Sequence, residues 1–446
     1  MTNLAQLEAY TRELSTAIKR LATHCQNAKV AVDSMRGGPP QLIPPGAPEE
    51  AHRARESALA SITKLQIMLA GPTDFLQQMA SQTQLLACVQ WLGEFQVPAC
   101  VPLDGSALMK DVSDLIGVPE TQLCRIIRMA TTAGFLQEPQ PGYIAHSALS
   151  ASFVTKPSYL DAAMFLAGTA VPAALEMAAA TKQRSGSSER ANVVSNNSAF
   201  SSSGETQLPR LQRQWHAYLR YVTEYLCDTA TDILTCLEPL RMENASVVEV
   251  GARSTERAIA LAKQYPTLHF TVQLNPACAL SSSRNGTAAS KFDKTQHPRS
   301  NPRINVQYRV PGTPQPILDA AVYIINFPLP APGVSSSTSL ATQINAELRA
   351  HLNALRMSRS ATMVLTVPSL SERGTVSTEA AVQTRIRDLS LMQLANEREL
   401  EMSELMNLLN GVSDSEGRLV LVNKVRSAGN NGAVALEVKY QAYTDR

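Results

Sequence analysis

One strand–helix–strand pattern constrains the fold of this chain more than any other part of its sequence. Residues 247–250 are apolar except for Glu249, as in a buried strand, and residues 251–255 have the composition of a tight turn. An amphipathic helix over 256–264 and a second apolar strand over 268–274 follow. This order is that of the first unit of a doubly wound, mostly parallel α/β sheet. We therefore predict such a Rossmann-like domain over residues 241–446.

The turn of this unit lacks the residues with which such sheets bind nucleotides. The turn needs small residues so that backbone N–H groups can approach the ligand, and a carboxylate must end the second strand to hold the ribose hydroxyls. Here only Gly251 remains of the small residues, and Arg253 lies in the turn. The second strand ends in Gln273 and Leu274 instead of an acid. The pattern thus predicts the architecture without its ligand chemistry.

Composition excludes several classes of protein. The 446 residues allow two or three domains, and a formal net charge of +2 argues against a nonspecific hold on nucleic acid. The first residues lack the basic and apolar regions of a signal sequence, and we find no run near the roughly 20 apolar residues of a membrane span. We therefore expect an intracellular protein. Its seven cysteines form no CxxC pair, which predicts free thiols and no metal site.

The N-terminal segment, residues 1–70, has the pattern of a helical arm. Leucine and isoleucine recur at helical spacing from Leu4 to Leu21 and again from Leu59 to Leu69. The prolines of residues 37–48 prevent one helix from crossing between them. Two helices joined by a linker could pack on their own domain, pack on a second subunit or dock a different protein.

Residues 71–160 have the pattern of a winged-helix module. Helices are predicted at 85–92, 106–117 and 118–136, and a hairpin turn at 140–145. The third helix offers only two cations, Arg125 and Arg128, to DNA, whereas a helix that reads bases shows more exposed cationic and amide groups. We therefore favour a structural or dimerisation module over one that reads DNA directly.

A helical connector is predicted over residues 161–240. It contains a serine-rich stretch at 185–204, and a second such stretch follows at 281–302. Both are polar and poor in apolar residues, so we expect loops that offer exposed contact or phosphorylation sites. With the arm, the winged-helix module and the α/β domain, the chain has a mixed fold.

Three segments resemble the plant and fungal small-molecule O-methyltransferases. Residues 106–153 are similar to the N-terminal dimerisation domain of that family, and the strand–helix–strand unit is similar to its S-adenosylmethionine motif. Residues 387–399 resemble the helix that follows its catalytic region, with closing strands at 418–422 and 434–438. The resemblance spans roughly residues 75–440 and implies the same fold and a possible homodimer.

The departures from this family fall on its chemistry. Arg253 lies where the methionine end of the cofactor would approach the backbone, and Leu274 lies at or near the position of the ribose carboxylate. Where the family has its histidine base and an adjacent acid, this chain has residues 326–333, which include Pro330. Methyl transfer to a phenol needs a base, and proline cannot act as one.

The histidines of the chain offer no replacement for this base. We expect each to be a surface or satisfied core residue, and this set comprises His146, His216, His269, His297 and His351. We therefore assign no catalytic, cofactor-binding or metal-binding residue, and we expect no cofactor.

The combination of an N-terminal arm, a degenerate cofactor loop and a missing base is similar to the fungal co-regulators of aflatoxin- and sterigmatocystin-type gene clusters. This resemblance implies a non-catalytic coactivator in the nucleus, with the cytoplasm as a second location. It also implies a zinc-cluster transcription factor as partner, which would supply the DNA reading, since this chain has no zinc-cluster cysteine spacing. The alternative is an active S-adenosylmethionine-dependent O-methyltransferase on an aromatic polyketide. A structural subunit that pairs with an active methyltransferase is the third option.

Overall fold

The computed structural model of the chain divides into two compact units. The first comprises residues 1–178, 210–222 and 377–379, and the second comprises residues 179–209, 223–376 and 380–446. Each unit is described by itself. The structure describes residues 3–32, 48–186, 208–223, 245–252, 254–276, 301–327, 339–367, 378–395, 397–398, 400–426 and 434–443.

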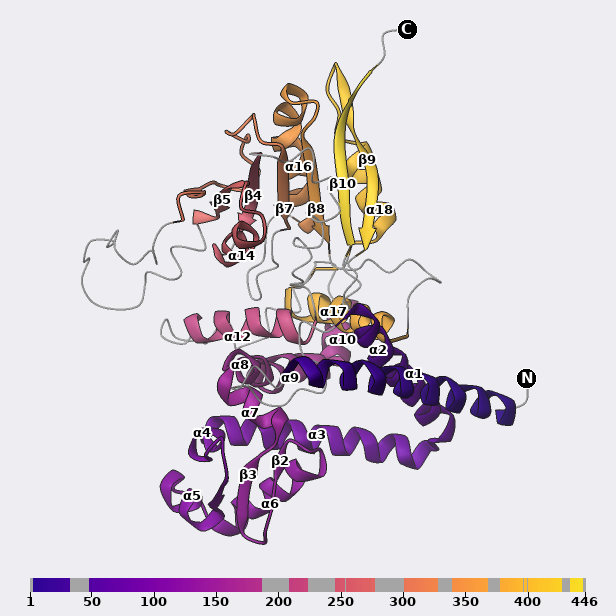
Figure 1. The fold of residues 1–446 in the computed structure, drawn as a ribbon, viewed down its shortest axis with the longest axis vertical. Helices are drawn as coiled ribbons and strands as arrows, with labels where there is room; N and C mark the ends of the chain where they lie inside the picture. Colours follow the sequence, from indigo (N-terminus) through magenta and orange to yellow (C-terminus); the bar gives the residue numbers. More distant parts are fainter. Residues whose placement is uncertain are drawn as a thin grey trace, which may run out of the picture. The chain divides into compact units, whose positions relative to one another are not determined.

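The first unit is mainly helical (Figure 1). Its helices and short strands are α1 (Asn3–Val32), α2 (Glu49–Leu69), α3 (Pro72–Glu94), α4 (Val97–Cys100), β1 (Ser106–Leu108), α5 (Met109–Ile116), α6 (Glu120–Thr132), β2 (Leu136–Gln137), β3 (Tyr143–His146), α7 (Ala148–Thr155), α8 (Ser158–Phe165), the π-helix η1 (Leu166–Ala170), α9 (Val171–Leu175) and α12 (Leu208–Tyr221). Helix α10 (Met177–Gly186) begins at the end of this unit and continues into the second unit.

The predicted arm is present as the two helices α1 and α2, which pack against each other. The side of α2 that is buried consists of small residues at helical spacing, namely Ala51, Ala54, Ala58 and Ser61. On α1 the buried residue is Ala17. Small side chains let two helices approach closely, so the arm buries little of its larger apolar side chains. The proline-rich linker lies outside the described residues.

A small antiparallel sheet in the order β1-β3-β2 packs with α5 and α6 around an apolar core that includes Leu123, Ile127 and Ile144. The expected helix over 106–117 begins only at Met109, because Ser106–Leu108 pair with β3 as a strand. The third expected helix ends at Thr132, earlier than predicted, and Leu136 instead begins β2.

One helical stretch changes an expectation about apolar runs. Among the described residues, only Ser158–Lys182 is long and apolar enough to cross a membrane, whereas we expected no such run. This is weak evidence for a membrane, because core helices of soluble proteins meet the same criterion. Phe165 in this stretch lies 5.3 Å from Trp215 and 5.0 Å from Tyr218, ring centre to ring centre. Phe165 is therefore buried beside α12, although only 33% of the apolar window is buried.

The second unit contains the predicted doubly wound sheet (Figure 1). Five strands are parallel, in the order β6-β5-β4-β7-β8, and β10 and β9 extend the sheet as antiparallel strands. Its elements are β4 (Ser246–Ala252), α14 (Glu256–Gln264), β5 (His269–Leu274), β6 (Ile304–Tyr308), β7 (Val322–Asn326), α16 (Leu340–Met357), β8 (Thr362–Val367), α17 (Thr378–Ala395), α18 (Met402–Asn410), β9 (Gly417–Arg426) and β10 (Val434–Ala442).

Each face of this sheet has its own apolar core. Val248, Val250 and Tyr323 point to the face covered by α16 and α18. Val247 and Ile324 point to the opposite face, which α14 covers. Because side chains alternate along a strand, both faces of these central strands are buried, which explains their continuous apolar sequence.

Candidate functional site

The candidate site lies at the carboxyl ends of β4 and β7. From β4 the chain continues through α14 to β5, and from β7 it continues to β8 on the other side, so the strand order reverses between these two neighbours. In doubly wound sheets such a switch point leaves a crevice where ligands bind. Whether this chain can bind a ligand at this position depends on the side chains of the strand ends.

Gly251 at the end of β4 is needed for the chain's own packing. Its φ is +66°, a conformation that favours glycine. A Cβ atom at this position would lie 3.1 Å from the backbone oxygen of Asn326 in β7. In a nucleotide-binding turn this glycine lets the ligand approach the backbone. In this chain the missing side chain leaves room for the backbone of Asn326 in the neighbouring strand.

A cluster of three polar side chains joins β4, β7 and α14 at the same place. Nη1 of Arg257 donates to Oδ1 of Asn326 at 2.7 Å and to Oε1 of Glu249 at 3.2 Å. Nδ2 of Asn326 in turn donates to Oε1 of Glu249 at 3.3 Å and to the backbone oxygen of Val250 at 3.0 Å. We call Glu249, Arg257 and Asn326 the switch-point cluster.

The electrostatics of this cluster are unusual for a nucleotide-binding edge. Arg257 lies in the first turn of α14, where the helix dipole favours a negative group over a cation. The Glu249 side chain is only 5% exposed and supplies the compensating charge. The N-terminus of α14, which could hold an anionic group of a ligand, therefore carries an internal ion pair.

These residues do not fit S-adenosylmethionine. The cofactor needs close approach to the glycine turn and a carboxylate for its ribose. Glu249 already accepts hydrogen bonds from Arg257 and Asn326. At the end of β5, Leu274 packs on the α14 face of the sheet, and Gln273 belongs to a separate buried network. Arg253 lies outside the described residues.

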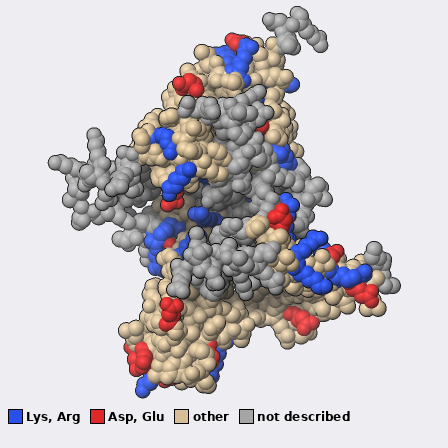
Figure 2. Space-filling view, viewed as in Figure 1, with Lys and Arg blue, Asp and Glu red and all other residues tan. Residues whose placement is uncertain are grey.

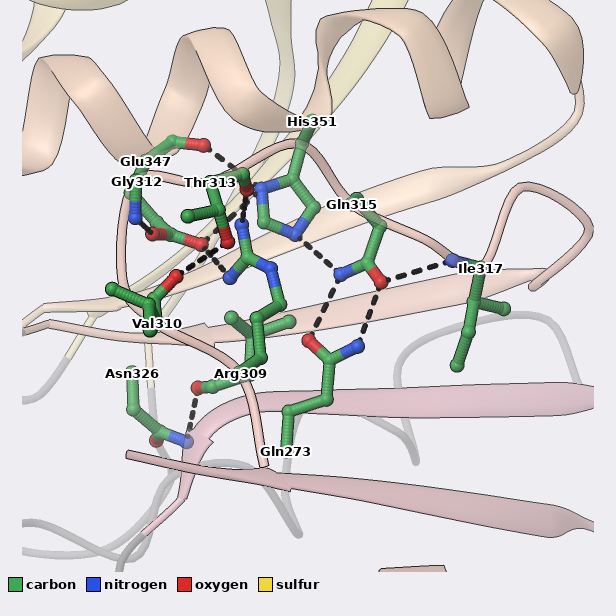
Figure 3. A network of polar contacts seen from close by, with 11 residues as sticks. Gln273, Arg309, Val310, Gly312, Thr313, Gln315, Ile317, Asn326, Glu347 and His351 are labelled. Atoms are coloured by element: carbon green, nitrogen blue, oxygen red, sulfur yellow. Dashed lines mark hydrogen bonds and ion pairs between the residues drawn. The ribbon is translucent and has the colours of Figure 1, made fainter. Parts of the chain in front are cut away.

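That separate network joins β5 to α16 through the segment between β6 and β7 (Figure 3). The side-chain amides of Gln273 and Gln315 bond reciprocally, at 2.7 and 3.0 Å. Nε2 of Gln315 lies 2.9 Å from Nε2 of His351, and the backbone N–H of Ile317 donates to Oε1 of Gln315. The amide at the β5 end is therefore used to hold the fold.

The network continues from α16 to the segment that follows β6. Nη1 of Arg309 donates to Oε1 of Glu347 at 2.5 Å, and the backbone N–H of Gly312 donates to Oε2 at 2.6 Å (Figure 3). Arg309 also donates to the backbone oxygen of Thr313. Because both charged side chains are buried, each compensates the charge of the other in the core.

His351 is a core residue and is placed poorly for catalysis. Its side chain is fully buried, and Nδ1 lies 2.8 Å from the backbone oxygen of Glu347, which can only accept. Nδ1 therefore carries the proton and Nε2 accepts from Gln315. Burial lowers the pKa of His351, so the ring is neutral. Burial likewise raises the pKa of the neighbouring Tyr323 to about 12.

The remaining expected positions are scattered. His146 bonds to Ser150 and to the backbone oxygen of Pro98 in the first unit, and His216 is exposed on α12. His269 is exposed at the start of β5. His297 and Pro330 lie outside the described residues. Among the described residues, no group of three or more His, Cys, Asp or Glu side chains could hold a metal ion.

The two cations of the predicted third helix do not form a DNA-reading surface. Arg128 on α6 pairs with Glu138, with 3.3 Å between Nε and Oε2. Arg125 is exposed on the same helix, whose apolar side faces the core around Leu123 and Ile127. Two cations on α6, one of them paired with a carboxylate, are fewer than a helix that reads bases presents to DNA.

The switch-point cluster and the glutamine network were not predicted from the sequence. Glu249 gave a usable signal, because a carboxylate inside an apolar strand needs a partner and Arg257 follows on the next helix. Gln315 gave none, since it lies in an irregular segment rich in proline. Its partners are brought to it only by the fold.

Comparison of the sequence with known proteins shows which proteins are related to this chain. Residues 4–70 match the family described as the "Trypacidin cluster transcriptional coactivator tpcD N-terminal domain". The chain is 70% identical, over the full length of both proteins, to the "Agnestins biosynthesis cluster transcriptional coactivator AgnL9" of Paecilomyces divaricatus. It is 48% identical to the "Monodictyphenone cluster transcriptional coactivator mdpA" of Emericella nidulans, over 99% of both chains.

Solved structures show the same fold at low identity. OxaC aligns with a TM-score of 0.63 over 99% of this chain and 100% of its own, at 15% identity. The mitomycin 7-O-methyltransferase MmcR aligns with a TM-score of 0.56 over 87% of this chain and 99% of its own, at 18% identity. These structural similarities show an O-methyltransferase-like fold. The family is shown by the relatives of high sequence identity. The chain belongs to the family of transcriptional coactivators of fungal secondary-metabolite gene clusters.

Proposed function

We propose that this protein is a non-catalytic, O-methyltransferase-like coactivator that switches on a fungal polyketide gene cluster. The observation that carries this proposal is the switch-point cluster. Arg257, Glu249 and Asn326 bond to one another where an enzyme of this fold would hold its cofactor. The close relatives with coactivator names support the same role for the chain as a whole.

The partner that we propose is a zinc-cluster transcription factor, which reads the DNA while this chain supplies a protein surface. The part of the chain that the structure describes offers no metal-ligand group and little cationic surface on α6. In this proposal the partner supplies the sequence-specific reading of DNA. The site of action that follows from this role is the nucleus.

The small sheet with α5 and α6 supports a second, structural proposal. Helix, turn, helix and the β2–β3 hairpin have the order of a winged helix, and α6 turns its apolar side to the core. We propose that this module is structural and that the protein forms a homodimer.

Titration with S-adenosylmethionine tests the non-catalytic part of this proposal. A ligand present at 100 times its dissociation constant stabilises a protein by about 2.7 kcal/mol. For a chain of this size that is a melting shift of several degrees. We expect neither heat in calorimetry nor a melting shift. Saturable binding with a clear shift would instead support the active methyltransferase.

The same titration of an Arg257→Ala variant gives a matched comparison. If the switch-point cluster is what closes the crevice, removing the guanidinium is the smallest change that could admit the ligand. Weak binding by the variant but not by the parent protein would attribute the loss of affinity to Arg257. Tight binding by both would contradict the proposal.

A further inference from the structure

Strand β6 forms one edge of the seven-stranded sheet, and among the described residues its outer side has no partner. Its register with β5 runs without a break over Ile304–Tyr308. The N–H of Phe270 donates to the backbone oxygen of Arg303, and the N–H of Arg309 donates to that of Leu274. The odd-numbered residues of β6 therefore bond to β5, because alternate residues of a parallel strand direct both backbone groups to the same neighbour.

The even-numbered residues of β6 direct their backbone groups away from β5. The N–H of Ile304 donates to the backbone oxygen of Asn301. The oxygen of Ile304 and both backbone groups of Val306 and Tyr308 remain, and no described residue bonds to them. The buried side-chain nitrogen Nε2 of Gln307 also lacks an acceptor among the described residues. This edge thus has more donors and acceptors than its own unit satisfies.

The other edge strand of the sheet is protected against pairing, whereas β6 is not. β9 carries three cations, Arg418, Lys424 and Arg426, and a register shift leaves Val422 without a partner on β10. Charges and bulges of this kind prevent an edge strand from adding a further strand. β6 contains no charged residue, proline, glycine or bulge. An edge without such protection is suited to pairing with another chain.

The surroundings of β6 favour an uncharged partner. Tyr308 is 58% exposed, and Val310 just beyond the strand is 56% exposed. The two neighbouring cations are used within the unit, since Arg303 donates to three backbone oxygens at the end of α14 and Arg309 pairs with Glu347. Figure 2 shows basic and acidic side chains interspersed over the described part of the visible face. Backbone pairing at β6 therefore does not depend on complementary charge.

We propose that β6 binds a short, uncharged, extended segment of the transcription-factor partner, which adds to the sheet as a further strand. Only an extended backbone meets donors and acceptors that recur at every second residue along an edge. A five-residue strand is about 17 Å long, which is too short for the roughly 1,200–2,000 Å² that a stable contact between folded proteins buries. A peptide therefore fits this edge better than a second copy of the chain. The inference rests on the proposed coactivator function and names the chemistry of one contact.

The contact at β6 adds to the contact that we expect for the arm. Pairing over five residues is weak alone, whereas two linked contacts bind far more tightly than either does by itself. Loss of the arm is therefore expected to release the transcription factor even when β6 is intact.

Overlapping fluorescent peptides of the transcription factor test this proposal on the full chain. We expect a peptide with alternating apolar residues to bind the parent protein in fluorescence anisotropy, and to bind Val306→Pro at least tenfold more weakly. Proline removes the outward N–H of position 306, leaves the bonds to β5 in place and is tolerated on edge strands. Val306→Thr is the matched control, because it keeps the N–H and the branched side chain. Equal melting temperatures show that both variants are folded.

Two further variants separate the two edges of the sheet. Tyr308→Lys places a charge on β6 and should also weaken binding, whereas Val422→Lys places the same charge at an exposed position of β9 and should not. Absence of binding by every peptide, or equal binding by Val306→Pro and Val306→Thr, would overturn the proposal. A parent dimer that Val306→Pro dissociates would also overturn it, since the occupant would then be a second copy.

Transcripts of the gene cluster distinguish failure of this site from failure of the coactivator role. If deletion of the gene abolishes the transcripts but no peptide binds, the coactivator role stands and the assignment of β6 is wrong. If a peptide binds at β6 but deletion leaves the transcripts unchanged, the pairing site stands and the coactivator role is wrong.

Discussion

At the scale of single residues, the switch-point cluster predicts an effect on the stability of the folded protein. Removing one partner of a largely buried ion pair leaves the other charge uncompensated, at about 3–5 kcal/mol for full burial. Arg257 is partly exposed, so we expect Glu249→Gln to lower the free energy of unfolding by about 2–3 kcal/mol. Urea unfolding of the purified protein measures this loss.

Arg128→Ala is the control for that measurement. Arg128 pairs with Glu138 on the surface of the first unit, where an ion pair contributes about 0–1 kcal/mol. If both variants lose the same small amount of stability, the switch-point cluster has no special role in the fold.

His351 predicts how stability depends on pH. Burial lowers the pKa of the folded imidazole, while the unfolded chain has a pKa near 6.5. Below about pH 6.5 the unfolded state therefore binds a proton that the folded state excludes. Stability is complete above this pH and falls as the solution becomes more acidic.

We expect the urea midpoint of the parent protein to fall between pH 7.5 and pH 5.5, and His351→Asn to show a smaller fall. His269→Asn, which changes an exposed histidine at the start of β5, is the control for this comparison. Equal slopes in all three proteins would show that another group controls the acid sensitivity.

The contacts of these residues were not predicted from the sequence. Glu249 could have been recognised, because a carboxylate inside an otherwise apolar strand needs a partner and the helix that follows contains Arg257. Asn326 and Gln315 gave no such indication, because their contacts lie 77 and 42 positions away along the chain, at Glu249 and Gln273. Contacts between side chains of irregular segments are decided by the fold and have no local pattern.

At the scale of elements, the strongly periodic segments were predicted well and the short ones were not. The helices of the arm and the central strands β4 and β5 lie where the apolar pattern put them. β1 was taken as part of a helix, since three residues are too few to show alternation, and pairing with β3 decides their conformation. Element ends depend on such tertiary pairing.

The arm predicts a separable function. Its two helices pack on each other through small residues, and the core around Leu123 contains no residue before position 85. Removing residues 1–70 should therefore leave a folded protein that no longer co-precipitates with its transcription factor. The melting temperature of the truncated chain checks its folding. Full retention of the partner would place the contact on the remaining units.

At the scale of the whole molecule, the chain combines a well-kept fold with a cofactor edge that is used for its own packing. The sheet order, the two apolar faces and the likeness to MmcR are those of an O-methyltransferase-like protein. The sequence predicted this architecture because buried parallel strands leave a continuous apolar pattern. The absence of cofactor binding, inferred from the residues of the turn and from Leu274, stays a prediction, and the structure adds to it the contacts of Arg257 with Glu249 and Asn326 at the ends of β4 and β7.

The most direct test of the coactivator role is deletion of the gene in its fungal host, followed by measurement of the transcripts of the surrounding gene cluster. We predict that these transcripts are lost in the deletion strain. A gene that encodes the Glu249→Ala variant should restore them as long as the variant is folded, since no cofactor site is needed. Normal transcripts in the deletion strain, with an unmethylated intermediate accumulating, would contradict the account and establish an enzyme.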